Sequence, residues 1–162
     1  MNIRVADKED AARLAEIIRT AYATVAARFG LTPENCPKHP SNCTPEWVQG
    51  DMDRGVVYYI LESGSRAVGC AALEKANPET CYLERLAVIP EKRKAGLGHR
   101  LVDYFLKQAA AQGFRTVGIG IIAEQRDLKS WYQEQGFVET GKKSFAHLPF
   151  DVAFMERHIE KA

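Results

Sequence analysis

A short basic turn with two glycines separates a β-prone segment from a segment of helical periodicity. The turn reads Arg93-Lys94-Ala95-Gly96-Leu97-Gly98-His99, and residues 91–100 hold four Lys or Arg against one Glu. A strand that leads through such a turn into a helix builds an anion site, because the first N–H groups of a helix lack intrahelical partners and lie at the positive end of its dipole. The turn therefore predicts an anion site, in a chain whose formal net charge is only +1.

The spacing of the glycines distinguishes this turn from other phosphate loops. It lacks the Gly-Lys-Ser/Thr of nucleotide hydrolases and the Gly-x-Gly-x-x-Gly of dinucleotide-binding folds. Arg93-x-x-Gly96-x-Gly98 resembles instead the [Gln/Arg]-x-x-Gly-x-[Gly/Ala] loop of the GNAT superfamily of N-acetyltransferases, which also follows a Leu-Ala-Val strand, here residues 86–88. The resemblance implies that acetyl-CoA is the co-substrate and that its diphosphate is the anion.

A second segment resembles the same family. Gln125-x-x-Leu128-x-x-Trp-Tyr132-x-x-x-Gly136-Phe137 is similar to the Asn-x-x-Ala-x-x-[Leu/Phe]-Tyr-x-x-x-Gly-Phe of the GNAT enzymes. Gln125 replaces the Asn that contacts the pantetheine arm in that family, and Leu128 replaces a small residue, but a Gln amide has the same donors and acceptor as Asn. The resemblance covers nearly the whole chain in element order and residues 81–137 most closely.

The resemblance assigns the co-substrate to two stretches of the chain. It implies that the diphosphate binds the backbone N–H groups of Arg93, Lys94, Ala95, Gly96, Leu97, Gly98 and His99. It implies that the acetyl-pantetheine arm lies along Leu86, Ala87 and Val88, in a cleft where two parallel strands splay apart. A backbone N–H near Val88 would polarise the thioester carbonyl in the manner of an oxyanion hole.

Tyr132 is implied to be the acid that gives a proton to the leaving thiolate. Its phenol, with an ordinary pKa of about 10, suits a thiol whose pKa is about 8.5. Core packing on the apolar side of its helix is the alternative role for Tyr132.

The base that takes the proton of the amine is left open. Glu84 alternates with Leu86 and Val88, which predicts that these three side chains share one face of the strand. Glu84 could take the proton, bind a cationic acceptor or form a structural ion pair with Arg85. His147, with an ordinary pKa of about 6.5, is the alternative base. In a third alternative, no base is needed, because much of the rate comes from positioning an amine that is already neutral.

The elements that hold these residues follow from periodicity and turn residues. Apolar spacing predicts helices that cover residues 7–29, 47–54, 98–111 and 127–135, the first capped by Asp7 and ended by Gly30. Alternating or continuous apolar runs predict strands at residues 2–5, 56–62, 67–74, 82–89, 115–123, 137–145 and 150–158. Four prolines between residues 33 and 45 predict no regular structure over residues 31–43.

The resulting order, β-α-α-β-β-β-α-β-α-β-β, predicts a mixed α/β (α+β) fold. It is the GNAT-like fold, a central mixed sheet of six to seven strands flanked by helices, and we expect residues 1–162 to form a single acetyltransferase domain. The crossover through the helix at 98–111 predicts that the strands on either side of it are parallel.

Composition sets bounds on the function. With 22 Lys or Arg against 21 Asp or Glu, the chain has no global field that favours nucleic acid or acidic lipid. No run is long enough to span a bilayer and the first residues do not resemble a signal peptide, so we expect a soluble, cytoplasmic protein with four reduced cysteines. Oligomeric state is left open, with a homodimer as one alternative.

A loop with two cysteines and a histidine precedes the second helix. Cys36-x-x-His39-x-x-x-Cys43 has three of the four ligands that structural zinc normally takes, so we expect no metal and interpret the loop as a lid that faces the substrate. A surface loop with reduced thiols is the alternative. In GNAT enzymes the segment that corresponds to residues 35–47 forms a wall of the acceptor site.

These features predict an enzyme that transfers an acetyl group from acetyl-CoA to a primary amine by direct attack in a ternary complex. The acceptor, a small molecule or a protein, is not identified by any motif. Two alternatives remain, a non-catalytic sensor that binds CoA or acyl-CoA, and an acyltransferase that uses another acyl-CoA.

Overall fold

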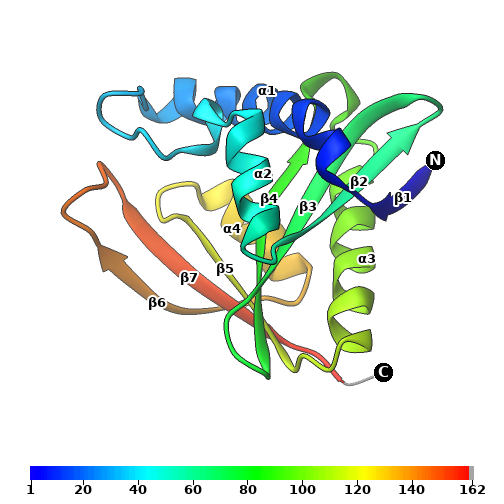
Figure 1. The fold of residues 1–162 in the computed structure, drawn as a ribbon. Coiled ribbons are helices and arrows are strands. Elements are labelled where there is room, and N and C mark those ends of the chain that lie inside the picture. The colour runs from blue at the N-terminus through cyan, green and yellow to red at the C-terminus, as the bar shows by residue number, and fades with distance from the viewer. Residues whose placement is uncertain (161–162) are drawn as a thin grey trace.

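The described part of the chain, residues 1–160 of a computed structural model, forms one mixed sheet of seven strands with four α-helices. The sheet order is β1-β2-β3-β4-β5-β7-β6 (Figure 1), and the predicted fold class and order of elements are confirmed. Within residues 1–160, no helix is long and apolar enough to cross a lipid bilayer. The strands are β1 (Asn2–Val5), β2 (Val57–Ser63), β3 (Arg66–Lys75), β4 (Thr80–Val88), β5 (Thr116–Ile122), β6 (Val138–Ser144) and β7 (Asp151–His158). The helices are α1 (Ala11–Phe29), α2 (Pro45–Asp53), α3 (Leu97–Ala111) and α4 (Arg126–Glu134).

Local chemistry sets the ends of the first two helices. Gly30 ends α1 in the left-handed region (φ 65°), where a residue without Cβ is favoured. The side chain of Thr44 accepts the N–H of Trp47 and caps α2. The prediction that residues 31–43 contain no regular structure is wrong at one point, because Pro40–Asn42 form a single 3₁₀ turn.

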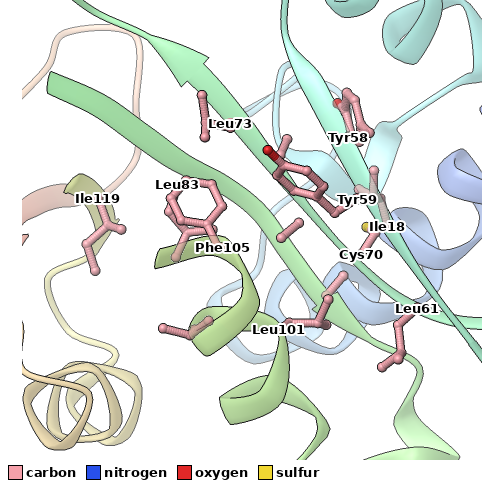
Figure 2. Close-up of a cluster of buried hydrophobic side chains, with 14 of the residues drawn as sticks. Ile18, Tyr58, Tyr59, Leu61, Cys70, Leu73, Leu83, Leu101, Phe105 and Ile119 are labelled. Atoms are coloured by element: carbon pink, nitrogen blue, oxygen red, sulfur yellow. The ribbon is translucent and has the colours of Figure 1, made fainter. Parts of the chain in front are cut away.

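Helices cover both faces of the sheet. Consecutive side chains of a strand point to opposite faces, and on β2 the hydroxyl of Tyr58 donates to Asp51 of α2, whereas Tyr59 packs edge-on against Phe105 of α3. Thus α2 and α3 lie on opposite faces, and α1 packs beside α2 (Figure 1). Figure 2 shows part of the buried apolar core, in which Leu101 and Phe105 of α3 lie with side chains of the central strands.

The two parallel strands at the centre of the sheet pair over only three residues. β4 and β5 pair from Thr80 to Tyr82 with Thr116 to Gly118, which confirms the predicted parallel pair. Beyond that point β4 continues along β3, whereas β5 continues along β7. The two strands therefore separate after Tyr82, and the second half of each has a backbone edge without a strand partner.

A bulge in β4 makes the predicted alternation of Glu84, Leu86 and Val88 wrong. Glu84 and Ala87, which are three residues apart on β4, lie opposite residues that are two apart on β3. The extra residue is accommodated at Arg85, whose φ is 54°. Because one extra residue reverses the alternation, Glu84 shares its face of the sheet with Ala87 rather than with Leu86 and Val88.

A buried carboxylate joins the first strand to the first helix. Asp10, only 5% exposed, accepts two hydrogen bonds of 2.9 Å from Arg4, one of 2.6 Å from Arg13 and one of 2.9 Å from the N–H of Asp7. The Arg4 guanidinium, with the Asp7 N–H and Arg13, lowers the pKa of Asp10 well below its ordinary value of 3.8. The ionised carboxylate therefore stabilises the fold above that value, and this stability is lost as pH falls through the lowered pKa.

We expect Asp10→Asn to lower the free energy of unfolding by about 2 kcal/mol at pH 7, because charge-assisted hydrogen bonds are lost and two cations keep fewer acceptors. Urea denaturation at pH 7 and pH 3 measures the effect. It should shrink at pH 3, because the Asp10 carboxylate of the unfolded chain, with its ordinary pKa of 3.8, is then mostly protonated while that of the folded chain stays ionised. Asp53→Asn is the control, since its pair with Lys8 lies on the surface. Equal losses for the two variants at pH 7 would contradict this account.

Candidate active site

The turn before α3 leaves a row of backbone N–H groups free. Lys94 (φ 64°) and Gly96 (φ 79°) both adopt the left-handed region, which makes a concave backbone of the kind that binds anions. Within the described residues, the N–H groups from Lys94 to His99 donate to no protein acceptor, and the first hydrogen bond of the helix runs from Arg100 N–H to Gly96 O at 3.0 Å. Six free amides at the N-terminus of a 15-residue helix fit a diphosphate.

The two basic side chains in this turn have different surroundings. Arg93 reaches α1, where its guanidinium donates to Ala21 O at 2.8 Å and to Thr24 Oγ1 at 3.1 Å, and its Nε donates to Val88 O at 3.3 Å. Arg93 thus fastens the turn to α1 and to the end of β4. Lys94 is exposed beside the free amides, so it is the side chain in this turn that can approach an anion.

A cavity of about 610 Å³, here named the helix cavity, lies between α1, the end of β4, the turn and α4. Most of the predicted co-substrate residues are brought together in its wall: Leu86, Ala87, Val88, Arg93, Lys94, Gly98, Gln125 and Tyr132. The side chains of Leu97 and His99 point elsewhere, because Leu97 is buried in the core and the His99 ring contacts Gln135 and Asp103. Ala95 and Gly96 are exposed and lie outside the wall.

A second cavity of about 760 Å³, here named the sheet cavity, lies over β4, β5 and β7 where β4 and β5 separate. Glu84 and Arg85 of β4, His39 of the loop after α1 and Phe154 of β7 belong to its wall. The two cavities share six wall residues and therefore adjoin there: Tyr22, Val25, Leu86, Gln125, Leu128 and Tyr132.

Tyr132 lies at the junction of the two cavities. Its ring is 6% exposed and packs edge-on against Trp131 and Phe137, with centroid separations of 5.0 and 5.4 Å. Its hydroxyl has no hydrogen-bond partner among residues 1–160, and burial raises its pKa, so the phenol stays protonated. It can donate a hydrogen bond across the junction, but its raised pKa disfavours complete proton transfer compared with an ordinary phenol.

Glu84 shares its surroundings with a second carboxylate. Burial and the neighbouring Glu74 of β3 raise the pKa of Glu84 to about 8. Arg54 donates to Glu74 at 2.9 Å, and the hydrogen bond with Glu84 lowers the pKa of Glu74. Near neutral pH the pair therefore holds one proton, mainly on Glu84. The alternative ion pair between Glu84 and Arg85 does not occur in the part of the chain that the structure describes.

Sequence reasoning missed two residues of the junction and the sheet cavity. Arg85 follows Glu84 directly, but it reaches the sheet cavity through a bulge that no pattern in the sequence signals. Tyr22 lies in the helix predicted over residues 7–29, where the apolar spacing gives it no functional role, yet its hydroxyl donates to Leu86 O at 3.0 Å and it belongs to both walls. The signal in the sequence that could have identified Tyr22 is its hydroxyl, which lies within an otherwise apolar face of the helix.

The two histidines considered from the sequence have different positions. His147 is exposed in the β6–β7 connection and belongs to neither cavity wall, so its assignment as the base finds no support in the geometry. His39 is buried, packs edge-on against Tyr22 at 5.8 Å and lies with Pro40 in the wall of the sheet cavity. Burial and the charge of Arg85 lower the pKa of His39 to about 4, so it is neutral at pH 7.

The cysteines are free and buried. Cys36 and Cys43 belong to different apolar clusters, and Cys70 and Cys81 lie within β3 and β4. Among residues 1–160, no three His, Cys, Asp or Glu side chains are grouped closely enough to hold a metal ion.

Comparison with known proteins identifies a family. The model of the acetyltransferase (GNAT) family matches residues 19–137, a stretch that includes β4, the turn and α4. The chain is also 25% identical over 132 residues to an uncharacterized N-acetyltransferase of Escherichia coli K12, YjgM. That alignment covers 80% of this chain and 77% of the relative.

Solved structures share the fold at low sequence identity. The ribosomal-protein-S18-alanine N-acetyltransferase of Escherichia coli superimposes with a TM-score of 0.78 at 16% identity, over 99% of this chain and 95% of that one. The yncA protein of Salmonella typhimurium, solved with acetyl-CoA, superimposes with a TM-score of 0.74 at 21% identity, over 100% and 95%. With most of its length matched by the family model, the chain belongs to the acetyltransferase (GNAT) family and is an N-acetyltransferase.

Proposed function

We propose that this protein transfers the acetyl group of acetyl-CoA to a primary amine by direct attack in a ternary complex. The observation that carries the proposal is the junction of the two cavities, where Leu86 and Tyr132 belong to both walls. The helix cavity adjoins the free amides of residues 94–99, and the sheet cavity has the volume of a small-molecule site. Two substrates held in adjoining cavities can react without a covalent enzyme intermediate.

The chain holds the co-substrate at several points. Bound acetyl-CoA supplies an activated acyl thioester. The amides of residues 94–99 and the Lys94 ammonium bind the diphosphate, and Gln125 contacts the pantetheine arm. The edge of β4 from Leu86 to Val88 has no strand partner on the side of β5, although Leu86 O and Val88 O accept from Tyr22 and Arg93. This edge offers backbone groups to that arm, and one N–H there polarises the thioester carbonyl.

Two side chains handle the protons, Glu84 in the wall of the sheet cavity and Tyr132 at the junction. Glu84, once ionised, takes a proton from the acceptor ammonium before the attack, or from the neutral amine as it attacks, directly or through water. Tyr132 donates a hydrogen bond to the sulfur as negative charge develops on it. Because the ordinary pKa of a thiol is about 8.5, below that of a phenol, Tyr132 stabilises the thiolate without having to lose its proton.

Release of free thiol from acetyl-CoA in the presence of a panel of primary amines tests the proposal. We expect release that depends on an amine and yields the N-acetylated product. Tight CoA binding without turnover for any amine would favour the non-catalytic sensor. Faster turnover with succinyl-CoA or propionyl-CoA than with acetyl-CoA would favour another acyl donor.

We expect kcat/KM to rise with pH through about 8, because Glu84 must lose its proton to act as a base. Glu84→Gln should remove this rise and lower kcat about tenfold at pH 9. This loss is below the range typical of a general base, because part of the amine is already neutral at that pH. Rate profiles from pH 6 to pH 10 with one amine measure both effects. An unchanged profile in Glu84→Gln removes the residue from the mechanism.

The matched variant for this profile is Glu74→Gln. Glu74 raises the pKa of Glu84 through a hydrogen bond and through its charge, so removal of that charge should move the rise in kcat/KM to lower pH without abolishing it. A shift in the opposite direction would contradict the proposed coupling.

A further inference from the structure

We propose that Arg85 binds a carboxylate of the acceptor, so that the acceptor is a small amino acid that carries its amine and its carboxylate on one molecule. This inference rests on the proposed function, because it identifies the occupant of the sheet cavity as the molecule that is acetylated. It extends that function by naming the chemical class of the acceptor.

Arg85 is a cation without hydrogen-bond acceptors. Its side chain is 18% exposed, and none of its guanidinium N–H groups donates to a protein acceptor within residues 1–160. Its Nε is fully enclosed without a partner, whereas Nη1 and Nη2 retain accessible surface. A buried polar group without a hydrogen bond destabilises a fold, and an arginine stays charged, so these donors call for an anion.

Residues 1–160 do not supply that anion within hydrogen-bond distance. The carboxylate nearest to Arg85 is that of Asp51, whose Oδ2 lies 3.8 Å from Nη2, beyond hydrogen-bond distance. The two Asp51 oxygens already accept bonds of 2.6 Å, one from Arg54 and one from the hydroxyl of Tyr58. Asp51 is therefore engaged elsewhere, and Trp47, whose ring centroid lies 5.5 Å from the guanidinium carbon, offers only a ring face.

The backbone brings Arg85 to the acceptor side at an energetic cost. A φ of 54° is unfavourable for a residue with a Cβ, and it occurs at the bulge that places Glu84 and Arg85 in the same cavity wall. Strain at a ligand site is commonly retained for what it positions. Here it sets a guanidinium beside the proposed base, at the edge of β4 that adjoins Leu86.

The other titratable groups in the wall of the sheet cavity do not neutralise the positive charge of Arg85. Glu84 holds a proton near neutral pH, so it does not neutralise its neighbour. Glu156 of β7 lies opposite Gly118, at the level of Tyr82, which is three residues before Arg85 along β4. At about 3.3 Å per residue, that is about 10 Å away along the strand. His39 is neutral at pH 7.

The wall of the sheet cavity indicates the chemistry of the rest of the acceptor. Apolar side chains from three segments line the cavity, among them Ile121, Phe150 and Phe154, and its volume of about 760 Å³ suits a small molecule. A carboxylate at Arg85, an amine near Glu84 and an apolar side chain against β5 and β7 together describe an apolar amino acid.

Acetylation of matched pairs of amines, with and without the carboxylate, tests the inference. The pairs are leucine with 3-methylbutylamine, phenylalanine with phenethylamine and 6-aminohexanoate with pentylamine, which cover short and long separations of amine and acid. We expect wild-type kcat/KM to favour the acid in at least one pair by about 10- to 100-fold, the range for hydrogen bonds to a charged group. Arg85→Gln should reduce that preference to about threefold or less, and Arg85→Lys should give an intermediate value.

Arg54→Gln is the matched control. It removes the other arginine that contacts Asp51, and Arg54 is not in the cavity wall. If Arg85 acted only by supporting Asp51, the two variants would lose the preference equally, which would overturn the inference. Preference for the amine in every pair, or a preference that survives Arg85→Gln, would overturn it as well.

Binding separates this inference from the proposed function. Saturation-transfer NMR with the same amino acids should detect binding to the wild type and its loss in Arg85→Gln, whether or not turnover occurs. CoA affinity, measured by calorimetry, should be equal in both proteins. Absence of CoA binding in the wild type would overturn the proposed function, whereas CoA binding without binding of any carboxylate-bearing amine would overturn the role of Arg85.

Discussion

Tyr132→Phe is expected to lower kcat by about 10² to 10³-fold, while CoA affinity stays within about threefold of the wild type. The hydroxyl is used only when negative charge develops on the sulfur, so its loss affects the transition state and not the ground state. Steady-state kinetics with acetyl-CoA and one amine, together with calorimetric CoA binding, measure the two quantities.

The structure indicates that Tyr132→Phe removes the hydroxyl without disturbing the packing around it. The Tyr132 hydroxyl has no hydrogen-bond partner within residues 1–160, so its removal leaves no protein group unsatisfied, and the ring contacts with Trp131 and Phe137 are retained. Tyr104→Phe is the control, because that ring packs on Tyr59 and its side chain belongs to neither cavity wall. A kcat for Tyr132→Phe within about threefold of the control would return Tyr132 to a packing role.

Gly98→Asp should weaken CoA binding by about 100-fold or more, because it puts a carboxylate among amides that would otherwise bind a diphosphate. A Cβ at position 98 would lie 3.3 Å from Cζ2 of Trp131, so the new side chain also narrows the helix cavity. Calorimetric titration with CoA at low and high salt measures the loss, and high salt should reduce its electrostatic part.

Two companion variants divide that loss into its causes. Gly98→Ala introduces the close contact without the charge and should cost less than Gly98→Asp. Gly141→Asp adds the charge to β6, where no atom lies within 4 Å of the new Cβ, and should leave CoA binding unchanged. Wild-type affinity in Gly98→Asp would mean that the diphosphate does not lie on the turn, and the assignment of residues 94–99 would have to be abandoned.

The pairing of β4 explains how one short segment serves both cavities. From Thr80 to Tyr82 the strand is held on both sides, so its start is fixed in the sheet. After the separation from β5, Glu84, Arg85 and Leu86 line the sheet cavity. Leu86, Ala87 and Val88 line the helix cavity, so Leu86 belongs to both walls. The bulge at Arg85 lies just before Leu86, and it leaves Glu84 and Ala87 on the same face of the sheet.

Features that depend on neighbours in the chain were determined by the sequence alone. Local rules of periodicity, glycine and proline give the turn at residues 93–99, the caps at Thr44 and Gly30, and the order of all eleven strands and α-helices. The predicted co-substrate residues came from two short segments, and the structure brings most of them into one wall.

Features that depend on strand register were decided by the tertiary structure. One extra residue in β4 decides whether Glu84 shares its face of the sheet with Leu86 or with Ala87, and no alternation pattern in the sequence indicates that residue. The proton shared with Glu74, the unpaired guanidinium of Arg85 and the length of the β4–β5 pair likewise arise between segments far apart in the chain. The physical reason is that local sequence sets backbone conformation, whereas burial and charge depend on which strands and helices pack together.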